Sequence, residues 1–132
     1  MAAPKVLFVC VQNACRSQMA QGFGRALGLD AHSAGSAPSG QVNPKAVASM
    51  AEVGIDLSTH ESKGLDAYRD VPFDATVTMG CGDACPFVPA PRREDWQIPD
   101  PKDMDPAEFA EVRELVRRQV EALAESLGTP SA

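Results

Sequence analysis

The sequence contains no long apolar run. No segment approaches the ~18 uninterrupted apolar residues that a membrane-spanning helix needs, so we expect no membrane span. The opening segment, MAAPKVLFVC, holds a single lysine and only a short apolar stretch. It lacks the basic segment, the longer apolar stretch and the cleavage site of a secretory signal. We therefore expect a cytoplasmic protein.

The sequence also has fewer basic than acidic residues. The chain has 12 basic and 18 acidic residues, a net charge of −6. A nucleic-acid-binding surface would show a basic patch or stripe, so we expect no nucleic-acid partner. The same charge disfavours anionic substrates at long range, so any anion site needs a local device that overcomes the overall field.

The length and composition are those of one ordinary domain. A chain of 132 residues with 44% apolar and 23% charged residues is typical of a globular protein with a real hydrophobic core. The sequence shows no repeat, no low-complexity tract and no domain boundary. We expect a single domain over residues 1–132 that acts as a monomer.

Four cysteines stand out: Cys10, Cys15, Cys81 and Cys85. In a cytosolic protein such thiols stay reduced, which leaves catalysis, redox cycling or metal binding as explanations. The three-residue gap between Cys81 and Cys85 is not the usual two-residue spacing of zinc sites, and neither histidine has a second histidine at ligand spacing. We therefore expect no metal.

Apolar patterns and turn residues predict alternating strands and helices. Strands are expected over 5–10, 31–34, 75–79 and 96–98. Helices are expected from 16 to Gly28, from the N-cap Asn43 to Gly54, over 65–68, and from the N-cap Asp105 to Gly128. This order predicts one α/β domain with a mostly parallel sheet. Ligands of such sheets bind at the carboxyl ends of the strands, so one crevice there would hold both Cys10 and Cys81.

The loop after the first strand has the form C-x5-R-S, from Cys10 to Ser17. Such a loop can wrap an anion with inward backbone N–H groups, to which the positive end of the following helix adds. Arg16 would hold two oxygens of a tetrahedral anion with its planar guanidinium, and Cys10 would lie beneath the anion, in line for attack. The substrate-binding residues are then Val11, Gln12, Asn13, Ala14, Cys15, Arg16 and Ser17. A merely buried Cys10 is the plainer alternative, but it does not explain Arg16 and Ser17.

The same loop contains residues that would support the nucleophile. The amides, Arg16 and a hydrogen bond from the Ser17 hydroxyl would activate the Cys10 thiol. Asn13 tolerates left-handed backbone and can brace its neighbours through its amide. Cys15 should point away from the anion, so we interpret it as a packing residue.

The segment CVQNACRSQMA resembles the active-site loop of the arsenate reductases built on the low-molecular-weight protein tyrosine phosphatase fold. Similar segments are HSAG at 32–35, VNPKAVASMAEVGIDLS at 42–58, VTMGCGDACP at 77–86 and EDWQIPDP at 94–101. The resemblance covers essentially the whole chain. It implies a four-stranded parallel sheet flanked by helices and the reduction of arsenate to arsenite.

The resemblance also implies a thiol relay. Cys10 would form a covalent arsenate adduct, and Cys81 would attack the Cys10 sulfur and release arsenite. Cys85 would then attack Cys81 in the resulting disulfide, which frees Cys10 and leaves a Cys81–Cys85 disulfide. Reduced thioredoxin, supplied by NADPH through thioredoxin reductase, would regenerate the enzyme, which carries no bound cofactor. The segment GCGDAC is more compact than in the familiar thioredoxin-coupled member, so glutaredoxin with glutathione, or mycothiol, remains an alternative reductant.

The family carries its general acid in an aspartate–proline dipeptide on a loop over the anion site. Asp100-Pro101 lies at this place in the sequence, and a donor near the bound anion would protonate the leaving oxygen. Asp-Pro is also frequent in ordinary loops. Asp103 and Asp105 are nearby competitors, although Asp105 is better explained as an N-cap.

Some thioredoxin-coupled relatives bind potassium through an asparagine, a glutamate, a serine and an aspartate. Here Asn13 and Ser33 match, but Gln21 and Lys63 stand at the two acidic positions. We expect the Lys63 ammonium to replace the ion and to hydrogen-bond Asn13 and Ser33. We therefore predict no dependence on potassium.

Two other functions are weighed against arsenate reduction. A tyrosine phosphatase needs only Cys10, Arg16 and Asp100, but such enzymes frame the substrate with aromatic residues, and the chain has a single tyrosine. It also has no use for Cys81 and Cys85, so we expect at most a weak phosphatase side activity. A non-catalytic arsenic or redox sensor would not need Asp100 or the complete anion loop.

Overall fold

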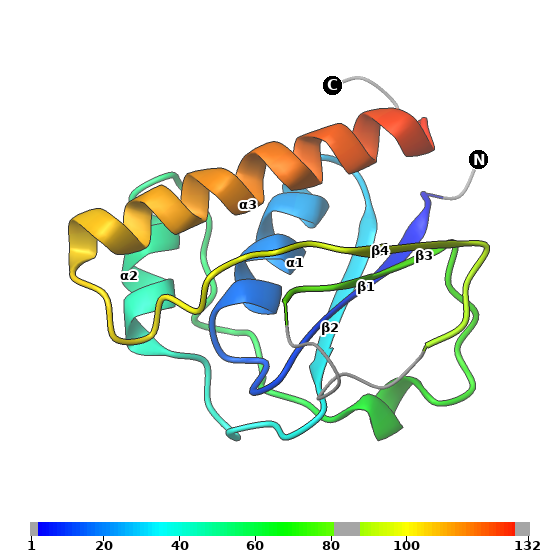
Figure 1. Ribbon diagram of the computed structural model, residues 1–132, viewed down its shortest axis with the longest axis horizontal. Helices are drawn as coiled ribbons and strands as arrows, with labels where there is room; N and C mark the ends of the chain where they lie inside the picture. The colour runs from blue at the N-terminus through cyan, green and yellow to red at the C-terminus, as the bar shows by residue number, and fades with distance from the viewer. Residues whose placement is uncertain (1–2, 81–87, 129–132) are drawn as a thin grey trace.

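A four-stranded parallel sheet in the order β2-β1-β3-β4 forms the centre of the protein (Figure 1). The structure is a computed structural model and describes residues 3–80 and 88–128. The strands are β1 (Lys5–Cys10), β2 (Asp30–Gly35), β3 (Ala75–Thr78) and β4 (Arg92–Asp95). The helices are α1 (Arg16–Ala26), α2 (Pro44–Ala51), α3 (Pro106–Leu127) and the 3₁₀ helix η1 (Leu65–Tyr68). The α/β class and the four-stranded parallel sheet are as the sequence predicts.

Strand β1 is buried on both of its faces. Its residues from Val6 to Val9 are fully buried, which is why the strand is a continuous apolar run rather than an alternating one. Val6 and Phe8 join the main core with α1, α2 and α3, whereas Leu7 and Val9 join a smaller cluster on the opposite face.

The carboxyl ends of β1, β2 and β3 meet at one edge of the sheet. Cys10 pairs with Gly35 of β2, and Val9 pairs with Thr78 of β3. The loop after β1 and the residues after β3 therefore begin side by side, which places the expected anion site at the edge that parallel sheets use for ligands.

Local signals define the helix ends. The Asn43 side chain accepts a hydrogen bond from the Lys45 backbone at the start of α2. Asp105 and Glu108 form a reciprocal capping box at the start of α3, and Gly128 closes this helix with a left-handed φ of 75°. These caps are as predicted. Within residues 3–80 and 88–128, no helix is both long and apolar enough to cross a membrane.

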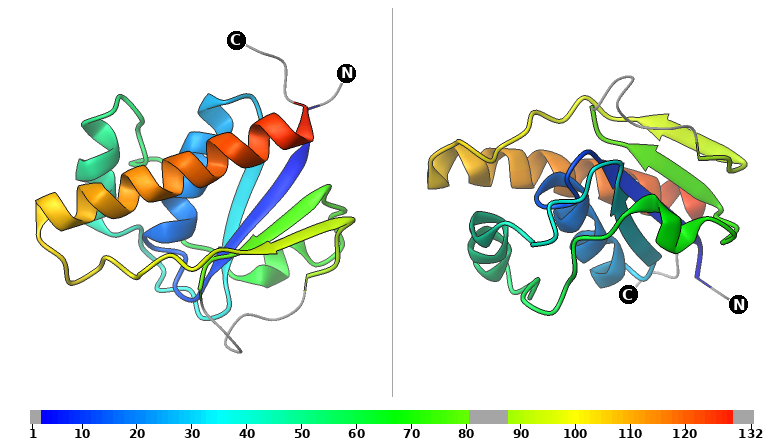
Figure 2. Two further views of the ribbon diagram at one scale, coloured as in Figure 1. Left: turned by 45° about the horizontal axis from the view of Figure 1, so that its top comes forward. Right: turned by 90° about the horizontal axis from the view of Figure 1, so that it is seen from below.

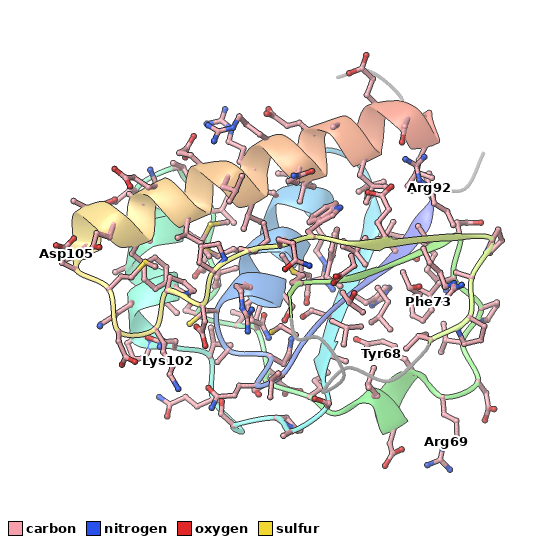
Figure 3. The ribbon with its side chains drawn as sticks, viewed as in Figure 1. Tyr68, Arg69, Phe73, Arg92, Lys102 and Asp105 are labelled. Atoms are coloured by element: carbon pink, nitrogen blue, oxygen red, sulfur yellow. The ribbon has the colours of Figure 1, made fainter. Side chains whose placement is uncertain are left out.

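The sheet face away from the main core is covered by η1 and irregular segments, as the second view in Figure 2 shows. Tyr68 and Phe73, which lie near each other in Figure 3, make edge contacts with one another and with His32. The single tyrosine of the chain, Tyr68, thus packs on this face of the sheet.

The predicted strand over 96–98 is wrong, because β4 spans Arg92–Asp95 instead. This edge strand pairs only with β3 and alternates half-buried and exposed charged residues, so it carries no apolar signal. Trp96 and Ile98 are buried because they pack into the core after the strand has ended.

Candidate active site

The anion loop, residues 11–17, runs from the end of β1 into the first turn of α1 and has its carbonyl groups tied to the surrounding structure. The carbonyl oxygens of Val11 and Gln12 accept from the backbone of residues 37 and 39 at 2.8 and 3.0 Å, and that of Ala14 accepts from Asn43 at 3.0 Å. The carbonyl of Cys10, at the end of β1, accepts from Ser36 at 3.3 Å.

With the carbonyls held outward, the backbone N–H groups of the loop are left for a ligand. None of those from Val11 to Ser17 donates a hydrogen bond to another group in the described part of the chain. The loop ends at the N-terminus of α1, where Cys15 provides no side-chain cap. Unpaired N–H groups at a helix start are a strong site for an oxyanion.

Asn13 holds the middle of the loop. Its φ of 51° makes it the one non-glycine residue with a left-handed backbone in the described chain, and it is fully buried. Its Oδ1 accepts from Gln18 Nε2 at 3.0 Å and from the Lys63 backbone at 2.8 Å. Its Nδ2 donates to Ser17 Oγ at 2.8 Å. Both expectations for Asn13, the left-handed backbone and the bracing amide, are met.

The Cys10 thiol faces the Ser17 hydroxyl. The Sγ and Oγ atoms lie 2.8 Å apart in a buried contact. Because Asn13 already donates to Ser17 Oγ, the hydroxyl hydrogen is free to point at the sulfur. A thiolate at Cys10 would therefore receive a directed hydrogen bond from the Ser17 hydroxyl.

Arg16 is buried and anchored by one nitrogen only. Its Nη1 donates to the carbonyls of Met79 and Ile98 at 2.7 and 3.2 Å. Its Nη2 lies 3.9 Å from Asp100 Oδ2. Neither Nη2 nor Nε has a hydrogen-bond partner within the described residues, so this edge of the guanidinium remains available to an anion.

Asp100 lies at the rim of the same site, on the segment between β4 and α3 (Figure 1). Its carboxylate is 41% exposed, pairs with Arg16, and accepts from the Lys102 backbone at 3.2 Å. The structure thus pairs Arg16, at the end of the loop that begins after Cys10, with Asp100 from a segment far along the chain. Their catalytic roles remain predictions.

Cys15 is packed in the main core and is 5% exposed. The pKa of its thiol is raised from 9.0 to about 12, chiefly by burial and next by the negative charges of Asp100 and Cys10. A thiol with such a pKa is a poor nucleophile near neutral pH. This environment agrees with the interpretation of Cys15 as a packing residue.

Cys81 and Cys85 lie outside the described residues. The chain leading to them is placed as far as Gly80, whose φ of 77° is left-handed. The Gly80 backbone donates to Asp95 at 3.4 Å, and a Cβ at this position would come within 3.3 Å of the Ile98 backbone nitrogen. The segment before Cys81 therefore leaves β3 directly beside the anchor of Arg16.

The low molecular weight phosphotyrosine protein phosphatase family matches residues 5–131. The chain belongs to this family. Of its relatives, the arsenate reductase of Staphylococcus xylosus is 42% identical over 123 residues, which is 88% of this chain and 92% of that protein. The glutaredoxin arsenate reductase of Synechocystis is 40% identical over 124 residues, 90% of this chain and 95% of that protein.

Solved structures give the same result. A structure described as an arsenate reductase in the phosphate binding state superposes with a TM-score of 0.86 at 37% identity, and the match covers 95% of this chain and 99% of that chain. The resemblance to arsenate reductases that the sequence indicates is thereby confirmed, together with the phosphatase-like fold.

The expected contacts of the Lys63 ammonium are wrong. Lys63 does reach Asn13, but through its backbone N–H. Its Nζ donates to the Tyr68 hydroxyl at 3.2 Å and lies 5.6 Å from the centre of that ring. The Gly35 backbone donates to the Lys63 carbonyl at 2.8 Å, which fixes the Lys63 backbone beside Asn13 and sends the side chain toward the opposite face of the sheet.

The potassium ion of some family members does not fit the residues present. Both lone pairs of Asn13 Oδ1 are already used by hydrogen-bond donors. The buried Ser33 hydroxyl donates to the neutral amide of Gln21, so Ser33 contacts α1 rather than the loop. A hard cation needs free oxygen ligands and usually carboxylates.

Gln18 and His60 support the loop and were not identified from the sequence. The fully buried Gln18 donates through Nε2 to the Glu61 carbonyl at 2.9 Å, and its second hydrogen is shared between the Asn13 carbonyl at 3.1 Å and Asn13 Oδ1. Its Oε1 therefore accepts from His60 Nδ1, at 3.0 Å. The only sequence signal is a glutamine within a helix whose buried side also carries Ser17 and Gln21, which is too general to predict this role.

Proposed function

We propose that this chain reduces arsenate to arsenite. The observation that supports this proposal best is the anion loop, whose N–H groups have no partner among the described residues and could surround a tetrahedral oxyanion above Cys10, next to the paired Arg16 and Asp100. The relatives described above are named arsenate reductases, and phosphate, which has the same shape and charge, is named as the ligand of one of the structures.

In the first step, the Cys10 thiolate attacks arsenic and forms a sulfur–arsenic bond. An arsenate hydroxyl group takes a proton from the protonated Asp100 carboxyl and leaves as water, and Asp100 is left as a carboxylate. The N–H groups of the loop and the free edge of Arg16 stabilise the charge on the remaining oxygens. The Ser17 hydroxyl stabilises the thiolate before the attack.

In the second step, a Cys81 thiolate attacks the Cys10 sulfur. The sulfur–arsenic bond breaks and its electron pair stays on arsenic, which leaves as arsenite, so the two thiols have supplied both electrons and end as a Cys10–Cys81 disulfide. Cys85 then attacks Cys81, frees Cys10 and leaves a Cys81–Cys85 disulfide. All these groups come from one chain, which supports a monomer as the working unit.

The final reductant is proposed to be thioredoxin, because a low-molecular-weight thiol such as glutathione or mycothiol would not require the second resolving cysteine, Cys85. The name of the Synechocystis relative keeps glutaredoxin as the competing choice, and mycothiol is the third. The phosphatase reading requires the same Cys10, Arg16 and Asp100, so a weak hydrolysis of aryl phosphates is expected as a side activity.

A coupled assay tests the proposal. Arsenate-dependent NADPH oxidation is measured with thioredoxin and thioredoxin reductase, with glutathione and glutaredoxin, and with mycothiol and its reductase system. We expect turnover with thioredoxin that is lost in Cys10→Ser, Cys81→Ser and Cys85→Ser, while Cys15→Ser retains it. Full activity of Cys85→Ser with thioredoxin would disprove the relay, and absence of arsenite with all three reductants would disprove the function.

A further inference from the structure

The first turn of α2 contacts both loops that form the candidate active site. The Asn43 backbone donates to the Ala14 carbonyl of the anion loop at 3.0 Å. Two residues later, Lys45 Nζ donates to the carbonyls of Lys102 and Met104 at 2.9 and 3.3 Å. One short helical turn therefore connects the anion loop to the segment that follows Asp100.

This second segment, residues 99–105, is here called the acid loop because it carries Asp100. Arg16 holds the carbonyl of Ile98 just before it, and Lys45 holds two carbonyls after Asp100. Figure 3 labels Lys102 on this loop and Asp105 at its junction with α3. Asp100 thus lies between two cations that each bind main-chain oxygen.

Two further hydrogen bonds of the acid loop are local. The Met104 backbone donates to the Pro101 carbonyl at 2.9 Å, and the Lys102 backbone donates to Asp100 Oδ1 at 3.2 Å. These bonds keep the shape of the turn but do not fix its position relative to Cys10. At its end the loop is tied to α3 by the Asp105 cap, and Met104 packs against the main core. Within the described residues, the hydrogen bonds that link the part of the loop after Asp100 to α2, the helix that also contacts the anion loop, are those of Lys45.

We propose that Lys45 is a positioning residue that fixes the place of Asp100 relative to the anion loop. The inference rests on the proposed role of Asp100 as proton donor to the leaving oxygen. Proton transfer requires the carboxyl group within hydrogen-bond reach of that oxygen, and a misplacement of about 1 Å can cost as much as 100-fold in rate. Charge-assisted bonds from an ammonium to carbonyl oxygens are strong enough to decide between two positions of an exposed loop.

A second explanation for Lys45 must be separated from this one. An exposed cation near the site would also attract arsenate toward a protein whose net charge is −6. Such attraction changes the rate at which arsenate meets the protein, and salt screens it. Positioning of the acid acts on the chemical step and passes through Asp100.

The test is the single-turnover formation of arsenite by the fully reduced protein, without external reductant, over a range of arsenate concentrations. The variants are Lys45→Met, Lys45→Arg, Asp100→Asn and the double variant Lys45→Met with Asp100→Asn. Lys5→Met is the matched control, because it removes the same charge at the opposite, amino end of β1, where the Lys5 side chain forms a 3.8 Å ion pair with Asp30.

We expect Lys45→Met to lower the maximal rate about tenfold with little change in the half-saturating arsenate concentration. Lys45→Arg should recover most of the rate, since arginine also donates to carbonyls, and Lys5→Met should match the parent protein. In the Asp100→Asn background, loss of Lys45 should cost nothing further, because residues that act through one another are not additive.

Three results would overturn the inference: an undiminished maximal rate in Lys45→Met, a rise only in the half-saturating concentration, or an equal loss with and without Asp100. If the parent protein forms no arsenite, the proposed function fails, and the same variants are then compared on phenyl and p-nitrophenyl phosphate. Positioning of the acid predicts that Lys45→Met slows the phenyl ester more, since phenolate needs the proton to leave. Equal slowing of both esters would overturn it.

Discussion

Cys10 Sγ and Ser17 Oγ lie 2.8 Å apart, although they come from the end of a strand and the first turn of a helix. Asn13 donates to the same hydroxyl oxygen and so orients its hydrogen toward the sulfur. The thiol, the hydroxyl and the amide therefore form one buried chain of hydrogen bonds that ends at the sulfur.

The first prediction concerns this chain. Ser17→Ala removes the donor to the sulfur, and a hydrogen bond to a charged group contributes ~1.5–3 kcal/mol. We expect the rate of Cys10 alkylation by iodoacetamide at pH 7 to fall about tenfold or more. Ser33→Ala is the control, because Ser33 is equally buried but contacts Gln21; a similar fall in both variants would contradict the prediction.

The second prediction concerns the close approach of β2 to the anion loop. A Cβ at Gly35 would lie 2.5 Å from the Val11 carbonyl oxygen and 2.9 Å from the Asn13 backbone nitrogen. Gly35→Ala should therefore push the loop away from its position and cost roughly 1–3 kcal/mol of unfolding free energy. Arsenate affinity, measured by calorimetry, should fall with it.

Gly64→Ala provides the comparison for Gly35→Ala. Gly64 pairs with Gly35 in an isolated bridge, but a Cβ there would have only Pro38 nearby, at 3.6 Å. We expect both stability and arsenate affinity to stay within error of the parent protein. A Gly35→Ala variant that binds arsenate like Gly64→Ala would show that the loop tolerates the added methyl group.

The fold followed from the sequence where the signals are local. The capping residues Asn43 and Asp105 define helix starts on their own, and the apolar run of β1 is long enough to be recognised. Strand β4 was misplaced because an edge strand can be built from charged residues when one side of it is solvated. The apolar residues Trp96 and Ile98, which are buried after the strand has ended, gave a false strand signal in the sequence.

The site was predictable in its motif and not in its supporting contacts. Cys10, Arg16 and Ser17 are neighbours in the sequence, so their spacing carries the geometry of the loop. The contact of Lys63 with Asn13 uses the backbone, which no side-chain pattern reports. The contacts of Gln18 and Lys45 join segments that are far apart in the chain, so they exist only after folding.

The third prediction concerns Cys15. Its folded-state pKa of about 12 lies above the ordinary value of 9.0, so its contribution to stability is complete below pH 9 and is lost as the pH rises toward 12. The difference in unfolding free energy between the parent protein and Cys15→Ala should therefore shrink from pH 9 to pH 11. Urea unfolding at each pH measures it, and a constant difference would contradict the prediction.

The fourth prediction concerns potassium. Because Asn13 Oδ1 is saturated and Gln21 provides only a neutral amide, we expect potassium and sodium chloride at equal ionic strength to give the same melting temperature and the same arsenate turnover. Lys63→Met should leave both unchanged, since the backbone makes the contact with Asn13. A rise specific to potassium would mean that these side chains rearrange around an ion.

The last prediction concerns the pH dependence that His60 adds. Burial, and next the positive charges of Arg25 and Lys63, lower the pKa of His60 below its ordinary value of 6.5, against the opposing effect of Asp56. The folded protein therefore prefers the neutral ring more than the unfolded chain does. The stability that His60 contributes is complete above pH 6.5 and is lost as the pH falls below this value toward the lower folded-state pKa.

His60→Asn isolates this effect, because an asparagine amide can take the place of Nδ1 as donor to Gln18 Oε1 but does not titrate. Between pH 7 and pH 5, the parent protein should lose more unfolding free energy in urea than His60→Asn does. His32 is present in both proteins, so its titration cancels in the comparison. Parallel curves for the two proteins would show that the ring beside Gln18 is not the titrating group, whereas converging curves would link acid sensitivity to the support of the anion loop.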